Sequence, residues 1–518
     1  MLADYAWLIP VLPLLAAAWI ALGYVFCFNR GEAGERETAR VAVGAAALSL
    51  LYSAALGGQA VIQGVPGQVV TVPWLASGAY VIDISFTLDG LALSLAVLVA
   101  FIALLTIRFS VNYMHREAGF QRFFITLCLF MAAMELIVMA GNAVLVFIGW
   151  ELAGVSSYLL IAYNFDCATA TRNANRAFIA NRVGDAGFLL GIFLAFAWLG
   201  DIEWPTLREN AGTLNQFQAD LIALAFLLAA LAKSAQVPFA PWIARAIEGP
   251  TPSSAIFYGA LMVHAGVYLL IRLEPVLQQA PVVMTLIAGL GFVTALYGWL
   301  SSLVQSDVKS SLMFSTTAQV GLMFLWCGLG WNELAAWHLA LHALWRAYQF
   351  LHAPSLMHRV SRPARPVPKW LTRRRGLYNA ALQRFWLDPL ADWLLVRPTQ
   401  SLALDVQNMD ERVVSRAVGL PAQASDLSSL GDPDAVQGGY VNLAAGDLVR
   451  GRGVFGRILQ WTATVLHWFE EHLVLRGGSE GLVDTIRHVG VFATQIEHLL
   501  SQPRYLIVLI MATFVMIL

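Results

Sequence analysis

Runs of about 20 mostly apolar residues recur along most of this chain. An α-helix needs about 20 residues to cross the hydrocarbon core of a bilayer, so each run is a candidate transmembrane helix. Hydrophobic residues make up 58% of the sequence and charged residues 13%, whereas soluble proteins carry about 45–50% and about 25%. The sequence therefore predicts an all-α polytopic membrane protein with about 12 transmembrane helices. The runs lie at about 6–27, 41–61, 88–108, 122–140, 142–163, 175–199, 219–247, 253–272, 281–303, 309–330, 332–354 and 503–518.

The seventh run is interrupted, and it contains the most informative residue of the sequence. Lys233 stands inside an otherwise apolar stretch, and Pro238 and Pro241 follow it. An ammonium group at bilayer depth is costly, so an intramembrane lysine indicates a functional site. Prolines break the helix, and a helix broken at membrane depth needs protein or water over its freed backbone groups. This combination indicates a buried proton or cation site.

Carboxylates in neighbouring runs are the expected counterparts of this lysine. Glu151 lies in the fifth run and forms the obvious candidate pair with Lys233. A buried carboxylate is protonated when it is alone and charged when an ammonium group lies close. Asp185 in the sixth run is an additional carboxylate. A second interpretation stays open for Asp185, namely a structural ion pair with Arg182 or Arg176 near a helix end.

A series of basic residues follows towards the end of the apolar part. His264 lies in the eighth run and Lys309 at the start of the tenth, while His338, His342 and Arg346 follow in the eleventh. The spacing of four residues places these last three on one helix face. Histidine both donates and accepts near neutral pH, which suits a proton relay, although the histidines could also serve only as hydrogen-bond partners of neighbouring helices. Guanidinium does not release its proton, so Arg346 is expected to tune His342 by its charge.

The loops predict how the chain lies in the membrane. Arginine and lysine gather after odd-numbered runs, most densely at 359–375, and the positive-inside rule places such loops in the cytoplasm. Alternating β-rich residues at 68–86, around an Ala-Ser-Gly turn, predict a small hairpin on the opposite, periplasmic side. The first run lacks a basic leader and a cleavage site, so we interpret it as a retained helix. These patterns fit a multi-pass protein of a bacterial inner membrane.

The composition divides the chain into four segments. Residues 1–87 hold the first helices and the hairpin, and residues 88–355 form the predicted translocation core. Residues 356–500 are rich first in proline and arginine and then in Ser, Asp and Gly, and contain amphipathic stretches typical of a cytoplasmic or interfacial extension. Residues 501–518 are predicted to form a last transmembrane helix.

Other function classes find no support in the sequence. The net charge is −1, which gives no indication of nucleic-acid binding. The four cysteines are scattered, so neither a disulfide framework nor a metal site is predicted. No nucleotide loop, haem ligand pair or nucleophile triad is visible, so no cofactor is expected. A reaction that drives this protein would have to occur in a partner.

Several motifs resemble those of a known family. They are Gly149-Trp-Glu-Leu-Ala-Gly154, Asn181-Arg-Val-Gly-Asp185, Lys233-Ser-Ala-Gln-Val-Pro238, Gly249-Pro-Thr-Pro-Ser-Ser254 and Phe314-Ser-Thr-Thr-Ala-Gln319. They occur in the order seen in the antiporter-like subunits, which include the L-type (chain 5) subunit of respiratory complex I and the multisubunit sodium/proton antiporters. The resemblance covers about residues 85–355. It implies an inverted-repeat fold in which two five-helix repeats each contain a broken helix.

The resemblance also implies roles for single residues. Glu151 and Lys233 would be the paired glutamate and lysine of the first half-channel, with Asp185 tuning them, and His338 and His342 would be the central histidines. The sequence departs from the family pattern at the eleventh-span lysine, which is Arg346 here. Tyr258 likewise replaces a histidine. The second broken helix with its lysine is missing, so the second repeat is expected to be incomplete.

Two functional hypotheses follow, and both involve proton translocation. The first is the membrane half of an energy-coupled inorganic-carbon uptake system of the DAB type, whose obligate partner is a large cytoplasmic zinc protein related to carbonic anhydrases. The alternative is an ion-pumping L-type subunit of a complex I-like or hydrogenase-like redox complex. The incomplete second repeat and the extension favour the former, whereas a faint L-type likeness of the tail favours the latter. A structural subunit that no longer conducts is a third interpretation, and the retained Glu151, Lys233 and histidines argue against it.

Overall fold

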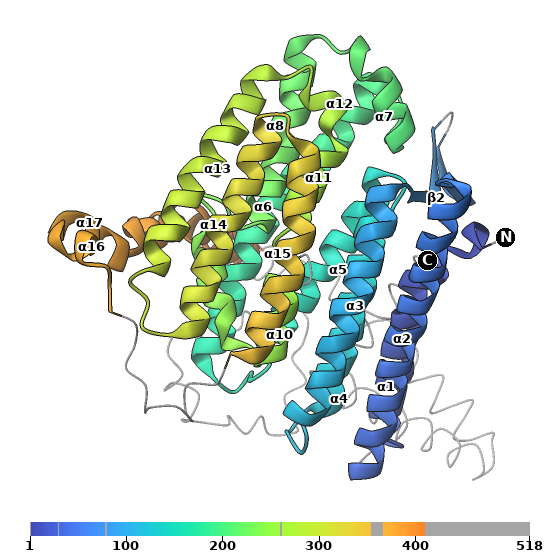
Figure 1. Ribbon diagram of the computed structural model, residues 1–518, viewed down its shortest axis with the longest axis horizontal. Coiled ribbons are helices and arrows are strands. Elements are labelled where there is room, and N and C mark those ends of the chain that lie inside the picture. The colour runs from blue at the N-terminus through green and yellow to red at the C-terminus, as the bar shows by residue number, and fades with distance from the viewer. Residues whose placement is uncertain (1, 30, 78–79, 260–261, 354–365, 410–518) are drawn as a thin grey trace, which may run out of the picture. The chain divides into compact units, whose positions relative to one another are not determined.

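The computed structural model describes residues 2–29, 31–77, 80–259, 262–353 and 366–409 (Figure 1). Residues up to Val396 belong to one compact unit, and α19 (Arg397–Met409) belongs to a second. The helices of the first unit that are longer than 15 residues are α1 (Leu8–Val25), α2 (Gly31–Gln63), α3 (Gly90–Tyr113), α4 (Phe120–Met139), α5 (Ala143–Ile161), α6 (Ala168–Leu199), α8 (Gln216–Lys233), α13 (Pro281–Ser302), α14 (Val308–Gly328) and α15 (Asn332–His352). Its shorter α-helices are α7 (Trp204–Asn210), α9 (Pro241–Arg245), α10 (Thr251–Gly259), α11 (Ala265–Arg272), α12 (Glu274–Leu277), α16 (Lys369–Arg373), α17 (Arg375–Leu382) and α18 (Leu387–Ala391).

The prediction of a helical multi-pass membrane protein is confirmed. Eight described helices are long and apolar enough to cross a membrane, namely the N-terminal stretch that contains α1, then α2 to α6, α8 and α13. Helices α14 and α15 are 21 residues long each and pack against one another. Among the described residues after α15, at 366–409, no helix reaches this length. The predicted last helix at 503–518 lies outside the described residues.

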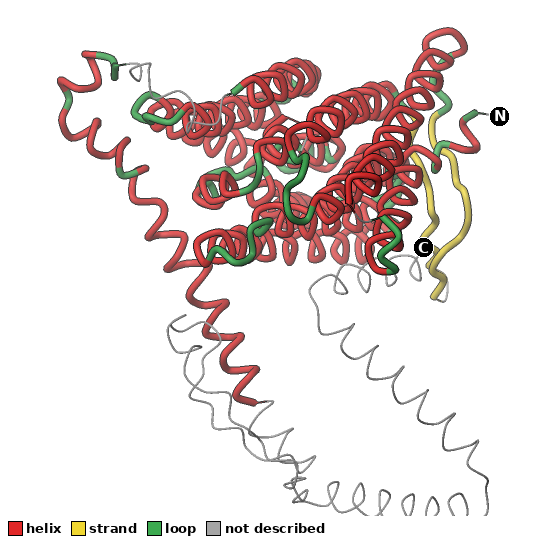
Figure 2. Tube along the Cα trace, turned by 90° about the horizontal axis from the view of Figure 1, so that it is seen from below, coloured by secondary structure: helices red, strands yellow, loops and turns green. Residues whose placement is uncertain are grey.

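The predicted hairpin is also confirmed. Strands β1 (Gly67–Ser77) and β2 (Tyr80–Leu88) pair antiparallel, with Gly67 opposite Leu88 and Ser77 opposite Tyr80. Figure 2 shows the two strands at one edge of the helical body. The hairpin is joined to the helices through Glu203, whose carboxylate accepts hydrogen bonds from Ser85 Oγ at 2.7 Å and from Asn142 Nδ2 at 2.7 Å. Asn142 also caps α5, because its side chain accepts from the backbone N–H of Leu145.

The broken helix lies where the sequence predicts it. Helix α8 ends at Lys233, Ala235 has a positive φ of 49°, and helical structure resumes at α9. The break removes the regular i+4 donors of the last carbonyls of α8. The carbonyl of Ala232 accepts instead from the backbone N–H of Ala235 at 3.2 Å and from Trp242 Nε1 at 2.7 Å. The freed groups are thus covered by protein.

The eighth run was predicted as one continuous helix, and this prediction is wrong. It is divided into α10 and α11, because the helix ends at Gly259 and begins again only at Ala265. Ser234 Oγ accepts a hydrogen bond from the backbone N–H of Gly266 at 3.1 Å. The residues beside the break in α8 therefore hold the first turn of α11, which lost its helical partners at the second interruption.

Small residues allow α13 and α14 to approach very closely. An added Cβ at Gly298 would lie 2.5 Å from the backbone nitrogen of Ala318 and 2.6 Å from the carbonyl oxygen of Phe314. Gly291 faces α14 in the same way, with 2.5 Å to the backbone nitrogen of Leu325. Close backbone approach through glycine is a common means of helix association in membranes, where no hydrophobic effect drives the helices together.

Replacing Gly298 by alanine is expected to separate these two helices and to destabilise the protein by about 1–3 kcal/mol, the usual range for overpacking. Gly289 provides a matched control on the same helix, because it is exposed and an added Cβ would meet nothing within 4 Å. Gly289→Ala should leave stability unchanged or raise it slightly, since alanine is the better helix former. Thermal unfolding of the purified variants in detergent measures both, and equal melting temperatures would contradict the packing argument.

Candidate functional site

Lys233 is held at the end of α8 inside the helical body. The residue is 1% exposed, and its Nζ donates to the backbone carbonyl of Trp150 at 2.7 Å. The ammonium group also lies 5.2 Å from the centre of the Trp150 ring, within range of a cation–π contact. A carbonyl and an aromatic face are neutral acceptors, so Lys233 has no directly bonded counter-ion among the residues that the structure describes.

We predicted that Glu151 pairs with Lys233, but in the structure the two side chains do not pair directly. Its carboxylate forms an ion pair with Arg182, and Arg182 Nη2 lies 3.0 Å from Asp185 Oδ2. The second oxygen of Asp185 accepts from Trp150 Nε1 at 2.9 Å. The contact between Asp185 and Arg182 that the second interpretation predicts is therefore present. The physical reason for the difference is that the long guanidinium side chain reaches both carboxylates from one turn of α6.

The side chains of Arg182 and Lys233 both approach Gly154. An added Cβ at Gly154 would lie 3.1 Å from Arg182 Nη2 and 3.3 Å from Lys233 Nζ. Glu151 stands one helical turn before Gly154 on the same helix. Lys233, which also lies beside Gly154, therefore offers Glu151 a second cationic partner besides Arg182. We named Arg182 only as a structural counter-ion of Asp185. Its spacing of three residues from Asp185 predicted that contact, but nothing local in the sequence predicts that it also takes Glu151.

Two histidines and an arginine form a second cluster. His264 Nε2 and His342 Nδ1 are 2.9 Å apart, and both residues are buried. Arg346 contacts the other nitrogen of His342, with 3.4 Å from Nε and 3.3 Å from Nη2 to His342 Nε2. The predicted common face of His342 and Arg346 on α15 is thus present. The position of His264 beside them could not be derived from spacing, because α11 and α15 are far apart in the sequence.

This cluster fixes where the imidazole protons lie. Guanidinium has only donors, so His342 Nε2 must accept from Arg346. Neutral His342 then carries its proton on Nδ1 and donates to His264 Nε2. It follows that His264 carries its own proton on Nδ1, an atom that is buried and has no hydrogen-bond partner among the described residues. The chain of donors therefore runs from Arg346 through His342 to His264.

His338 is turned to a different partner. Trp326 Nε1 donates to His338 Nδ1 at 3.2 Å, so neutral His338 carries its proton on Nε2, which lies 2.9 Å from Gln319 Oε1. The rings of His338 and His342 are 6.1 Å apart, close but not hydrogen-bonded. Gln319 belongs to the Phe314–Gln319 motif on α14, so this hydrogen bond joins α14 to α15.

Lys309 lies apart from both clusters. Its Nζ donates to Thr251 Oγ1 at 2.5 Å, and the hydroxyl of Tyr113 is 3.0 Å from the same oxygen. These residues belong to the starts of α14 and α10 and the end of α3. The Lys233 site and the histidine cluster are linked more directly, because Ser234 follows Lys233 and binds the first turn of α11, which begins next to His264.

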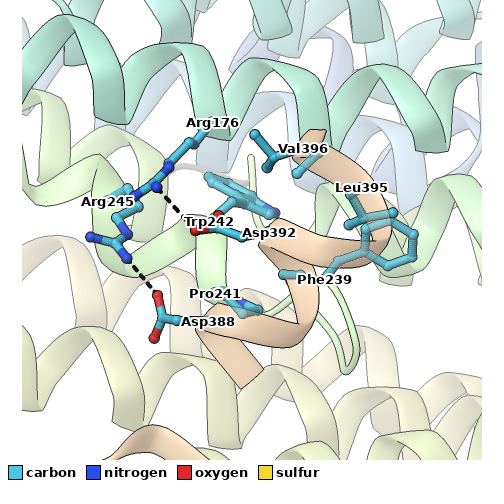
Figure 3. Close-up of a pocket in the computed structure, with 11 residues that line it drawn as sticks. Arg176, Phe239, Pro241, Trp242, Arg245, Asp388, Asp392, Leu395 and Val396 are labelled. Atoms are coloured by element: carbon cyan, nitrogen blue, oxygen red, sulfur yellow. Dashed lines mark hydrogen bonds and ion pairs between the residues drawn. The ribbon is translucent and has the colours of Figure 1, made fainter. Parts of the chain in front are cut away.

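Two ion pairs hold residues 388–396 against α6 and against α9, the second piece of the broken helix. Arg245 Nη2 lies 2.8 Å from Asp388 Oδ1, and Arg176 Nη2 lies 2.9 Å from Asp392 Oδ2 (Figure 3). Trp242 lines the same pocket and is the side chain that donates to the carbonyl beside Lys233. The segment 388–396 therefore contacts the helix pieces that position the lysine.

Asp89 joins three helices near the hairpin. It accepts from the backbone N–H of Ala92 at the start of α3 and forms a two-pronged ion pair with Arg272 at the end of α11. Arg272 Nε contacts the hydroxyl of Tyr268, which in turn donates to the carbonyl of Val138 in α4 at 3.0 Å. Burial alone would raise the pKa of Asp89, but the hydrogen bond and positive charge of Arg272 outweigh it and hold this pKa below its usual value.

This depressed pKa predicts acid sensitivity. The folded state favours the ionised carboxylate of Asp89, so its contribution to stability is complete at neutral pH and is lost as the pH falls below the usual value of 3.8. Asp89→Asn should lower the melting temperature at pH 7 and weaken its dependence on pH in this acidic range. Melting curves in detergent between pH 7 and pH 3 test this, and parallel curves for the two proteins would contradict it.

Among the described residues, no group of three or more His, Cys, Asp or Glu side chains lies close enough to hold a metal ion. What the described groups can do is exchange protons. The lysine can lose and regain one, a carboxylate beside it can change its affinity, and two bonded imidazoles can pass one on.

Family models match most of the helical core. The model described as NADH:quinone oxidoreductase/Mrp antiporter, TM, matches residues 140–379, and that of NADH-ubiquinone oxidoreductase (complex I), chain 5 N-terminus, matches residues 74–124. Both agree with the resemblance drawn from the motifs, and the recognition of the family is thereby confirmed.

Curated relatives and solved structures agree with these matches. NAD(P)H-quinone oxidoreductase chain 5 of Synechocystis is 36% identical over 365 residues, which cover 69% of this chain and 53% of the relative. The chloroplastic subunit 5 of Nephroselmis olivacea is 38% identical, over 68% of this chain and 55% of the relative. The Mrp complex from Dietzia sp. DQ12-45-1b matches at a TM-score of 0.56 and 27% identity, over 66% of this chain and 37% of that one. The predicted antiporter-like fold is thus confirmed, and the chain spans about half the length of the curated relatives it matches.

Proposed function

The chain belongs to the family of antiporter-like membrane subunits of NADH:quinone oxidoreductases and Mrp antiporters, and from this premise we propose that it is a proton-translocating subunit of a larger membrane assembly. The observation that carries the proposal is the arrangement around Lys233. The ammonium group of Lys233 is fully buried at a helix break and donates to the neutral carbonyl of Trp150. The neighbouring carboxylate of Glu151 is paired with a different cation, Arg182. Such a group can release and regain a proton as its neighbours move.

The proposed cycle uses the competition of Lys233 and Arg182 for Glu151. When Glu151 stays on Arg182, Lys233 lacks a counter-ion and releases its proton more readily, because an isolated buried charge is unfavourable. When Glu151 moves to Lys233, its charge stabilises the ammonium form, so the neutral amine of Lys233 takes up a proton through water near the break at Pro238. Asp185 holds Arg182 in place throughout, since it binds both Arg182 and the indole of Trp150.

Lys233 is proposed to exchange protons with the histidine cluster. The link is the contact of Ser234 with the first turn of α11, directly after His264. His264 and His342 are within hydrogen-bond distance, and with the proton of His342 on Nδ1 a transfer between them runs from His342 to His264 and needs no intermediate water. The ion pairs of segment 388–396 with α6 and α9 offer a route by which a docked partner changes this site.

Two kinds of protein are candidates for the partner of this chain. The comparisons favour subunits of a complex I-like redox assembly, since the relatives are named as quinone oxidoreductase subunits and an Mrp complex. A second candidate is a cytoplasmic zinc protein of the carbonic-anhydrase type, with proton flow coupled to inorganic-carbon uptake in a bacterial inner membrane. It is favoured by one observation, namely that the family match ends at residue 379, so that the extension proposed to start at 356 lies largely outside the matched region.

Affinity purification of the tagged full-length protein in mild detergent, followed by mass spectrometry, distinguishes these candidates. Quinone-oxidoreductase or hydrogenase-type subunits would support the redox assembly and exclude the carbon-uptake reading. A large soluble zinc protein as the sole partner would do the reverse. Purification without any partner would contradict the proposal that the chain works in an assembly.

A further inference from the structure

A groove of about 560 Å³ runs between α1 and α2 (the α1–α2 groove), the helices at one edge of the body in Figure 1. One wall consists of Leu12, Leu15, Trp19 and Leu22 of α1, and the other of Arg40, Val41, Gly44 and Leu48 of α2. The helices are antiparallel and are fastened above the groove, where Ser49 Oγ donates to the carbonyl of Ile9 at 3.1 Å. Pro13 leaves this carbonyl without a helical donor, so the contact satisfies it.

Most of the groove is apolar and open. Leu15, Trp19, Leu22 and Leu48 are between 45% and 58% exposed, although all of them are large apolar residues in spanning helices. Gly44 forms part of the floor, and an added Cβ there would meet nothing within 4 Å. In a bilayer, a concave apolar surface of this kind is complementary to an acyl chain.

The end of the groove is different, because it carries a cation. Arg40 is exposed and has no hydrogen bond or ion pair to any described side chain. Three acidic residues stand in the first turns of α2. Glu32 pairs with Arg116 at 2.6 Å and Glu35 with His115 at 2.9 Å, and Glu37, three residues before Arg40, forms no ion pair with it. Arg40 precedes Leu48 by eight residues, which is about 12 Å along the helix. It thus stands where a headgroup would lie if an acyl chain filled the groove.

We propose that the α1–α2 groove binds one anionic phospholipid, with its phosphate on Arg40 and an acyl chain between Leu15 and Leu48. Guanidinium binds phosphate oxygens in a two-pronged geometry, and an unpaired arginine at the membrane surface favours a headgroup with net negative charge. A transmembrane helix is the competing occupant, and it would have to bring an acidic residue or bury this charge unpaired. The chain's own apolar run at 503–518 contains no aspartate or glutamate.

Native mass spectrometry of the full assembly, purified in mild detergent and supplied with phosphatidylglycerol or phosphatidylethanolamine, tests the proposal. Wild type should retain one phosphatidylglycerol and discriminate against phosphatidylethanolamine. Arg40→Gln should weaken retention about tenfold, the usual loss for one charged hydrogen-bonding group. Gly44→Leu should block the groove and abolish retention. Arg108→Gln is the matched control, because Arg108 is an exposed arginine of α3 outside the groove.

Equal retention by wild type, Arg40→Gln and Gly44→Leu would overturn the proposal, as would equal binding of the two lipids. A protein occupant would show itself in two ways. Either Gly44→Leu would release a co-purifying subunit, or Leu48→Cys would form a disulfide cross-link with Val508→Cys in the run 503–518. Either result would replace the lipid by that helix.

Discussion

Replacing Lys233 by alanine is expected to reduce proton translocation by about 100-fold or more in membranes that contain the complete assembly. The change removes the only buried ammonium group beside the helix break, and positioned proton-transfer groups typically contribute factors of this size. The carbonyl of Trp150 then loses its donor, but Glu151 keeps its ion pair with Arg182. Glu151 and Asp185 both keep Arg182 as their cationic partner, so the protein should still fold and assemble.

A further variant separates the charge from the exchangeable proton. Lys233→Arg keeps a cation at this position but does not deprotonate, so it should fail like alanine if exchange is the function. Lys369→Ala provides the matched control, because Lys369 is exposed on α16 and lies outside the core. The measurement is acidification of inside-out vesicles followed with a pH-sensitive dye, with assembly checked by native gel. Normal flux in a correctly assembled Lys233→Ala variant would show that the relay does not pass through this residue.

The sequence predicted the large elements of this fold because bilayer physics acts over long, regular stretches. Apolar runs of about 20 residues located the spans, and the alternating pattern before Phe86 located the hairpin. The break after Lys233 was visible because prolines mark it. The interruption between α10 and α11 has no such mark, because the sequence contains no proline there and the run around it has the length of one span.

The residues of the site could be predicted from the sequence, but the contacts between them could not. Glu151, Lys233 and Asp185 were identified because charge is rare and costly in a spanning helix. Which cation takes which carboxylate depends on how α5, α6 and α8 pack, and in particular on Gly154, which lets Arg182 and Lys233 approach the same point. Likewise, helix periodicity placed His342 and Arg346 on one face, whereas the bond from His342 to His264 depends on the packing of α11 against α15.

Arg346→Met is expected to reduce proton translocation at least about tenfold, although Arg346 itself never gives up a proton. Its guanidinium donates to His342 Nε2 and thereby keeps the imidazole proton on Nδ1, directed at His264. Without this donor, neutral His342 can carry its proton on either nitrogen, and only the tautomer with the proton on Nδ1 donates a hydrogen bond to His264. Methionine fills much of the volume, and replacing a buried charge by an apolar side chain is often neutral for stability.

Arg346→Lys distinguishes this role from simple packing. Lysine also donates to His342 Nε2, so it should restore most of the flux, and because lysine can release its proton, the pH dependence of transport should change. Nitrogen-15 NMR of labelled histidine reports the tautomer directly and should show Nδ1–H for His342 in wild type and Arg346→Lys, and a mixture in Arg346→Met. If Lys and Met variants lose flux equally, or if the tautomer stays fixed in Arg346→Met, the arginine does not orient the relay.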